Sequence, residues 1–211
     1  MSFSKLLYNR RGFIAQVYLI LALQLSITFV VAKYLREHQG VYKFALKFFI
    51  PLIILPFMII IAFPYCPQYL KLGLFCAFSF ILGILSLGAS RYISGELIEV
   101  ALISTVSVFV IMTILGLGLA SMGIDLSFLY FTLLAVLIGI IIVRIILLFS
   151  GVESEVYKAI ATFSIIVFSI FVSFDTNRML QKGYSLDAID TAMGFYLDIE
   201  NLFSNFIEMG R

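Results

Sequence analysis

Charged residues are scarce in this sequence. Asp, Glu, Lys and Arg make up 12% of its 211 residues, whereas 63% of the residues are hydrophobic. Soluble globular domains carry about 25% charged residues, roughly twice as many. This composition excludes an ordinary water-soluble domain and indicates a chain whose solvent is lipid. The net charge is only +2, so no strongly basic field points to nucleic acid as a partner.

Cysteine and histidine are scarce as well. Cys66 and Cys76 are the two cysteines, which are too few for the disulfide framework of a small secreted domain. We interpret them as small apolar side chains. His38 is the one histidine, and it falls between two apolar segments. It is therefore not placed to act as the base of an intramembrane serine hydrolase.

Long apolar segments make up nearly the whole chain. A helix that spans a bilayer needs about 20 mostly apolar residues. We predict such helices at 12–32, 44–63, 70–90, 97–120, 127–149, 157–179 and 188–209. The links between them are short, so residues 1–211 are expected to form a single all-α integral membrane domain. Six spans are the alternative if the last segment does not cross fully.

Several charged residues lie near the ends of predicted helices. Arg144 is about five residues from the end of its helix, and an arginine side chain can extend that far to the lipid headgroups. Glu96 and Glu99 lie at the start of the fourth helix, and Asp125 precedes the fifth. Carboxylates at these places cap a helix or suit its dipole. We interpret Arg144 as an anchor, with a place on an internal pathway as the alternative.

Asp198 has no such explanation. It lies about ten residues inside the last predicted helix, roughly 15 Å from the nearer end at 1.5 Å per residue. At about 100° per residue, a polar stripe follows one side of this helix: Thr191, Gly194, Asp198, Asn201, Asn205 and Glu208. Other helices are expected to surround it, so that the stripe lines a polar contact or a water path. The alternative is an amphipathic helix on the membrane surface, although such helices usually carry Lys and Arg.

The preceding helix supplies a partner for Asp198. Asp175 lies near the end of the sixth predicted helix, and a short turn joins that helix to the last one. Both aspartates are therefore expected in the same half of the membrane. Two carboxylates in one low-dielectric site cannot both ionise cheaply, so a pair that shares a proton would act as a pH-sensitive latch. The alternative is two unrelated aspartates, each hydrogen-bonded locally.

Arg178 follows Asp175 by three residues, so both lie on the same side of the sixth helix. Its guanidinium could keep Asp175 ionised and leave Asp198 to take the proton. The alternative is an arginine at the level of the lipid headgroups.

Four segments carry a resemblance to a known family: VYLILALQLSITF at 17–29, DLSFL at 125–129, FDTNRML at 174–180 and YLDIENLF at 196–203. In their order and spacing, the chain resembles the transmembrane Bax inhibitor motif family. This family includes the Bax inhibitors, the lifeguard and Golgi anti-apoptotic proteins, and bacterial calcium-leak members. The likeness covers essentially the whole chain, and YLDIENLF together with the upstream FDT is its most specific part.

The resemblance implies a fold and a function. The fold would be six helices around a central, C-terminal seventh helix. The function would be a pH-dependent calcium leak gated by an aspartate pair that matches Asp175 and Asp198, which would also hold calcium transiently. Because calcium prefers oxygen ligands, Asn201, Asn205 and Glu208 are the predicted lining of the path. Many members suppress cell death by lowering calcium in internal stores.

The same resemblance implies partners and a location. The expected partners are the lipid bilayer, calcium and protons, with calcium as the transported ion and no cofactor. Cell-death regulators and calcium-handling proteins are further expected partners, and nucleic acid is not. The membrane would be that of the endoplasmic reticulum or Golgi in a eukaryotic or viral protein, and the plasma membrane in a bacterial one.

One segment departs from the family pattern. Bacterial members have an arginine cluster after the second helix, and one of its arginines locks the aspartate pair. Here the corresponding segment is AFPYCPQYLK at 62–71, with Cys66 near the expected position and no arginine. We hypothesise that Arg178 partly substitutes, because it is a cation one turn from Asp175.

Two other functions stand beside the channel as alternatives. A scaffold or regulator would act through partner helices, and the small residues Gly83, Gly116 and Gly118 permit close packing. An intramembrane aspartyl protease would also use two membrane aspartates, but the sequence has FD and YLD and no GxGD motif. A leak channel is the preferred prediction, and enzymatic activity is not expected.

Overall fold

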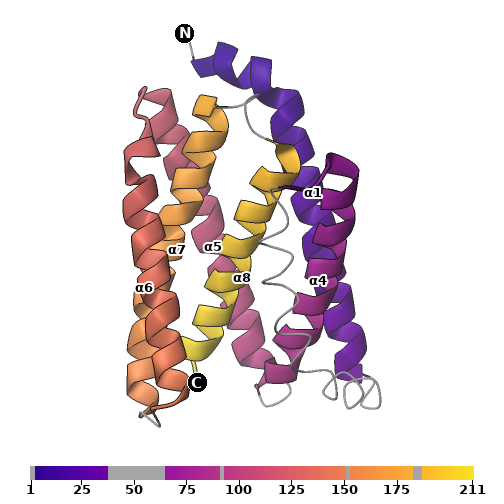
Figure 1. Cartoon of the computed structure of the whole chain (residues 1–211), viewed down its shortest axis with the longest axis vertical. Coiled ribbons are helices and arrows are strands. Elements are labelled where there is room, and N and C mark those ends of the chain that lie inside the picture. The colour runs from indigo at the N-terminus through magenta and orange to yellow at the C-terminus, as the bar shows by residue number, and fades with distance from the viewer. Residues whose placement is uncertain (1–2, 38–64, 91–92, 151–152, 183–186) are drawn as a thin grey trace. The chain divides into compact units, whose positions relative to one another are not determined.

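The computed structural model is all-helical over the residues that it describes, which are 3–37, 65–90, 93–150, 153–182 and 187–211. Its helices are α1 (Phe3–Glu37), α4 (Gln68–Ser90), α5 (Gly95–Ser121), the short 3₁₀ helix η2 (Leu126–Leu129), α6 (Tyr130–Leu148), α7 (Ser154–Lys182) and α8 (Ala188–Met209) (Figure 1). The predicted helix at 44–63 lies outside the described residues.

Several of these helices extend beyond the apolar segments that predicted them. α1 begins at Phe3 instead of residue 12, and α7 continues to Lys182 instead of residue 179. Arg10 in the added part of α1 donates hydrogen bonds to the carbonyl oxygens of Met179 and Gln181, at 3.2 and 3.1 Å. The last carbonyls of a helix lack partners within the helix, so Arg10 caps α7. Hydropathy marks the apolar part of a helix, whereas charged residues at its ends stay helical.

Five helical segments of the described chain are long and apolar enough to cross a membrane: Leu7–Tyr34, Gln68–Leu85, Gly95–Ser121, Leu126–Leu147 and Ser154–Gln181. Large apolar side chains on α5 and α6 are exposed, Ile111 and Ile142 among them, as lipid contact requires. The chain is therefore a multi-pass integral membrane protein. α8 is not among the five segments, since it carries four carboxylates. Seven spans and a central last helix stay predictions.

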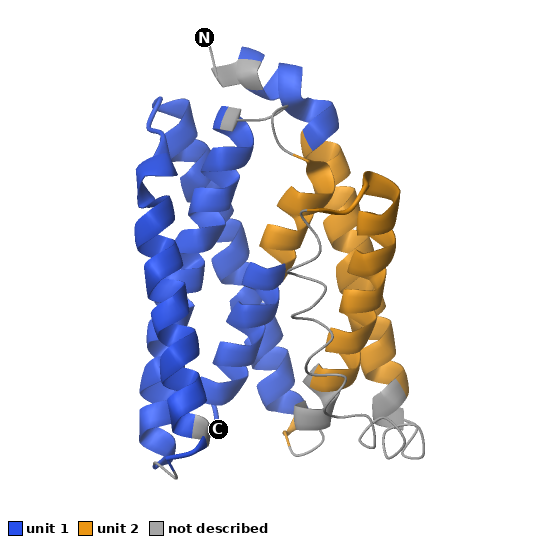
Figure 2. Cartoon of the chain, in the orientation of Figure 1, with its two compact units in different colours: residues 1–13, 95–186, 197–211 blue, residues 14–94, 187–196 orange. Residues whose placement is uncertain are grey.

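The chain divides into two compact units, which Figure 2 colours separately. Unit 1 contains Met1–Phe13, Gly95–Leu186 and Leu197–Arg211, and unit 2 contains Ile14–Ser94 and Asp187–Tyr196. The boundary between Tyr196 and Leu197 divides α8, so the first part of this helix belongs to unit 2 and the rest to unit 1.

In unit 1, α5, α6 and α7 run side by side (Figure 1). The core of this unit contains Phe168 and Val172 of α7 and Leu202 of α8, with apolar side chains of α5 and α6 packed against them. Gly116 allows α5 and α7 to approach closely, because a Cβ there would lie 2.6 Å from the carbonyl oxygen of Ser173. The packing of α5 on α7 therefore depends on a residue without a side chain.

In unit 2, α1 packs against α4. Gly83 of α4 lies against α1, where an added Cβ would be 2.9 Å from both the Thr28 carbonyl oxygen and the Val31 Cβ. The interior holds apolar side chains from both helices and from the start of α8, including Val17, Phe75 and Tyr196, each of them fully buried. Unit 2 thus holds the start of α8 against α1 and α4.

Candidate functional site

α8 carries most of the predicted site, and its start is capped by Asp187. The Ile189 N–H donates to Asp187 Oδ1 at 2.8 Å, and the Thr191 N–H donates to the Asp187 carbonyl oxygen at 3.0 Å. A side-chain oxygen that accepts from an early N–H of a helix is the usual N-cap arrangement. This cap sets where the helix begins.

The polar stripe of α8 is not on an exposed face. Asp198 and Asn205 are buried, with 5% and 2% of their surface exposed, and the other four members are half-buried. A helix lying on the membrane surface would have this stripe in water. The observed burial disagrees with that alternative and agrees with a stripe enclosed by protein.

Asp175 and Asp198 both belong to unit 1. Their carboxylates lie close enough for the charge of Asp175 to act on Asp198, and the charge of Arg178 acts on Asp175. Asp198 Oδ2 is buried and makes no hydrogen bond within the described part of the chain. A buried carboxylate oxygen without a donor beside a second carboxylate is an arrangement suited to a shared proton or a bound cation.

Arg178 lies beside an aromatic ring. Its guanidinium carbon is 5.9 Å from the centre of the Tyr130 ring, within the range of a cation–π contact. The ion pairs found among the described residues do not include one between Arg178 and Asp175. Arg178 therefore acts on Asp175 through space and not through a direct ion pair.

Residues on either side of Asp175 fasten this part of α7 to its neighbours. The Ser173 hydroxyl donates to the Met112 carbonyl oxygen of α5 at 2.7 Å. Asn177 Nδ2 donates to the Ile124 carbonyl oxygen at 2.8 Å, and Asn177 Oδ1 accepts from the Leu126 N–H at 3.0 Å. The FDTNRML segment thus contains Asp175, and through Asn177 it also hydrogen-bonds to the link between α5 and α6. Asp125 accepts from the Ser127 N–H at 2.8 Å and so caps the 3₁₀ helix η2. The sequence predicted that it caps the fifth helix, but α6 begins only after η2 and has no side-chain cap.

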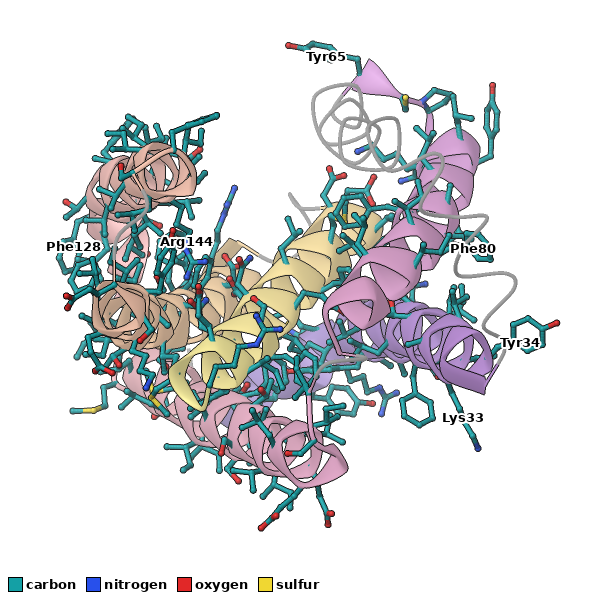
Figure 3. The ribbon with its side chains drawn as sticks, turned by 90° about the horizontal axis from the view of Figure 1, so that it is seen from below. Lys33, Tyr34, Tyr65, Phe80, Phe128 and Arg144 are labelled. Carbon is teal, nitrogen blue, oxygen red and sulfur yellow. The ribbon has the colours of Figure 1, made fainter. Side chains whose placement is uncertain are left out.

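Arg144 binds the far end of the polar stripe. Its Nη1 lies 2.9 Å from Glu208 Oε2, and its Nη2 donates to Asn205 Oδ1. The sequence indicated an anchor at the lipid headgroups, because nothing local to α6 reveals a partner on α8. In Figure 3 the Arg144 side chain extends from α6 toward α8. Two of the three predicted path-lining residues are therefore bound to an arginine.

A buried polar network in unit 2 contains Tyr196 of the YLDIENLF segment. The Tyr196 hydroxyl lies 2.6 Å from the Thr28 hydroxyl, which donates to carbonyl oxygens of α1 and α4. The Ser79 hydroxyl donates to Gln24 Oε1 at 2.8 Å. Tyr18 stacks on Phe195, with ring centres 6.0 Å apart. Polar and aromatic residues of the first family segment thus contact the start of α8.

Carboxylate and amide oxygens are the groups that this site offers to a cation. Asp175 and Asp198 supply the carboxylates, and the stripe supplies further oxygens. Within the described ranges there is no group of three or more His, Cys, Asp and Glu side chains placed to hold a metal ion.

Comparison with known proteins agrees with these features. The family model described as "Inhibitor of apoptosis-promoting Bax1" matches residues 10–209. The chain belongs to this family. It is 31% identical to the protein LIFEGUARD 4 of Arabidopsis thaliana, over 96% of this chain and 85% of that protein. It is 29% identical to the Bax inhibitor 1 of Schizosaccharomyces pombe, over 95% of this chain and 76% of that protein.

Membership of the Bax inhibitor family confirms the resemblance that the four segments indicated. The family model covers all four, from VYLILALQLSITF to YLDIENLF. The structure assigns these segments to two tasks. Two of them carry the aspartates of unit 1, and the first and the last contribute Thr28, Gln24 and Tyr196 to the polar network of unit 2.

Lys71 is one residue of this Bax inhibitor family member that the sequence did not single out. It is the last residue of the AFPYCPQYLK segment, which contains no arginine. Its ammonium lies 2.6 Å from Asp190 Oδ1 and 3.4 Å from Asp187 Oδ2, and its side chain is buried. A lysine one turn inside an apolar helix needs a partner, and the two aspartates at the start of the last helix were the available signal.

Proposed function

We propose that this protein conducts calcium across its membrane as a pH-sensitive leak, with Asp175 and Asp198 as the gate. The observation that supports this most is the buried Asp198 carboxylate, whose Oδ2 has no hydrogen-bond donor among the described residues and which lies beside Asp175. Calcium is the transported ion and binds only transiently, because two carboxylates supply fewer oxygens than the six to eight ligands of a resident calcium site.

The gate works through a single proton. With one proton between them, the two carboxyl groups hold each other by a charge-assisted hydrogen bond, and α7 stays against α8. Loss of that proton leaves two like charges that repel each other and attract a divalent cation. Arg178 is the charged group that acts on Asp175 from its own helix, and Asp175 is the one that acts on Asp198. The pH response therefore belongs to the pair and its arginine together.

Calcium flux into liposomes tests the gate. The protein is reconstituted in vesicles that contain a calcium-sensitive dye, and flux is followed from mildly acidic to mildly basic pH. Asp198→Asn removes the shared proton and should abolish the pH dependence. Glu96→Gln is the matched control, because Glu96 is an exposed carboxylate at the start of α5, and it should keep the wild-type profile. If Asp198→Asn retains both the flux and its pH profile, the aspartate gate is wrong.

Arg178 has its own test in the same assay. Its charge acts on Asp175, so we propose that it partly replaces the family's arginine. Arg178→Ala should shift the pH midpoint of flux, whereas Lys158→Ala, which removes a partly exposed partner of Glu155, should not. An unchanged midpoint in Arg178→Ala would remove this residue from the mechanism.

A second candidate function is the regulation of cell death through partner proteins. The family description and the name of the Schizosaccharomyces pombe relative support it. The test expresses wild type and a variant without calcium flux in cells in which Bax is induced. Protection by both proteins would favour a scaffold, whereas protection by the wild type alone would favour the leak.

The protease alternative is tested with a transmembrane reporter peptide. We expect the protein not to cleave it.

A further inference from the structure

Arg144 is the one charged residue of α6, a helix composed otherwise almost entirely of apolar residues. Its neighbours Val143 and Ile145 are exposed, as lipid-facing residues are. Arg144 instead turns to α8 and binds two members of the polar stripe, Asn205 and Glu208. An arginine that needed only an anchor would use the lipid headgroups, so its binding to the stripe requires another explanation.

The contacts orient each oxygen toward the guanidinium. Asn205 Nδ2 donates to the Asn201 carbonyl oxygen at 2.6 Å, which turns Asn205 Oδ1 toward Arg144 Nη2. Arg144 Nη1 lies 2.9 Å from Glu208 Oε2. Asn201 in turn donates to the Leu197 carbonyl oxygen at 2.7 Å. Two side-chain oxygens that a passing calcium ion would use are thus occupied by arginine donors.

The charges lead to the same conclusion. Glu208 is the negative group at this end of the stripe, and Arg144 neutralises it. A fixed guanidinium also repels any cation that approaches along α8. While Arg144 is bound, this end of the stripe offers neither the free oxygens nor the negative charge that calcium requires.

We propose that Arg144 is an internal cation that closes the path at the Glu208 end, as a second gate in addition to the aspartate pair. This inference rests on the proposed calcium leak and concerns the other end of its polar stripe. Opening requires the guanidinium to leave Asn205 and Glu208.

From its position on α6, the Arg144 side chain can reach the lipid headgroups once it has left the stripe. It lies four residues from the end of α6 at Leu148, about 6 Å at 1.5 Å per residue. A guanidinium at that depth reaches the lipid headgroups. Both Arg144 and Glu208 keep part of their side chains exposed, 38% and 26%, so their separation leaves neither charge isolated in an apolar interior. Arg144 therefore has two positions, one on the stripe and one at the headgroups.

The test measures calcium flux in liposomes at the pH where the wild type conducts least. Arg144→Gln should raise the flux several-fold, because it removes the blocking charge. Arg144→Lys should stay closer to the wild type, since an ammonium can still pair with Glu208. Lys158→Gln is the matched control, because Lys158 is also a partly exposed cation, but it pairs with Glu155 of its own helix and not with a residue of the stripe. It should leave the flux unchanged.

Three outcomes decide the matter. A wild-type flux in Arg144→Gln, together with an altered pH profile in Asp198→Asn, would overturn the Arg144 gate and leave the leak standing. If neither the wild type nor any of the variants conducts calcium, both the proposed leak and the Arg144 gate are wrong. If circular dichroism shows that Arg144→Gln is unfolded, the reciprocal variant Arg144→Glu with Glu208→Arg restores the ion pair. Its flux should be as low as that of the wild type, and a high flux would refute the gate.

Discussion

Replacement of Gly116 by alanine should separate α5 from α7 and destabilise unit 1. An alanine Cβ at this position would lie 2.6 Å from the Ser173 carbonyl oxygen and 2.8 Å from the Thr176 Cβ. Ordinary van der Waals contact begins at 3.4 Å, so the two helices must separate locally by about 0.8 Å. Both neighbours flank Asp175, so the same displacement should disturb the aspartate pair.

A second glycine on the same helix allows the magnitude to be isolated. Overpacking of a filled site costs about 1–3 kcal/mol, whereas Gly→Ala within a helix gains roughly 1 kcal/mol. At Gly118 nothing lies within 4 Å of an added Cβ, so Gly118→Ala should change stability only through the higher helix propensity of alanine. Gly116→Ala has the same gain in helix propensity and also the cost of overpacking. The free energy of unfolding of Gly116→Ala should therefore be lower than that of Gly118→Ala by about 1–3 kcal/mol.

Thermal unfolding in detergent, followed by circular dichroism, measures this difference. Tryptophan fluorescence does not apply because the chain has no tryptophan. Gly139→Ala on α6 is a further control, because it also adds a Cβ to open space. Equal melting temperatures for Gly116→Ala and Gly118→Ala would refute the close approach of α5 and α7.

Three further predictions concern other contacts. Tyr196→Phe removes the 2.6 Å hydrogen bond to Thr28 and should lower the free energy of unfolding by about 1 kcal/mol; an unchanged melting temperature would argue against the polar network in unit 2. Asn177→Leu removes two hydrogen bonds to backbone groups and should lower the free energy of unfolding by about 2–3 kcal/mol. Thermal melting also measures this change. Lys71→Met and Asp190→Asn should couple by about 1 kcal/mol in a double-mutant cycle, and additive effects would contradict their ion pair.

Much of the fold follows from hydropathy, because lipid permits only a few backbone arrangements. A segment of about 20 apolar residues in a bilayer must satisfy its N–H and C=O groups internally, and a helix does so. The positions of the apolar helices were therefore predictable, including the segment that contains α6. Their ends were not, because a charged residue such as Arg10 lies in a helix beyond its apolar part, where it caps the end of α7.

The last helix shows how far local reasoning extends into the site. Asp198 could be selected because an aspartate cannot reach water from the middle of a helix, and Asp175 because a short turn joins two antiparallel neighbours. Arg144 and Lys71 could not be assigned partners in this way. Arg144 is 61 residues from Asn205, and Lys71 is 119 residues from Asp190. The period of a helix tells which residues share a face of that helix, and it contains no information about which helix lies opposite.

By itself, the sequence determined that the chain is helical, that it lies in lipid, and that one polar stripe with a deep aspartate runs along its last helix. These properties depend on the solvent and on the 3.6-residue period, and both act locally along the chain. Only the tertiary structure decided what the polar groups bind: Arg144 at Asn205 and Glu208, Lys71 at Asp187 and Asp190, and Tyr196 at Thr28. The physical reason is that a charged or polar group in an apolar interior takes the partner that helix packing brings within hydrogen-bond distance.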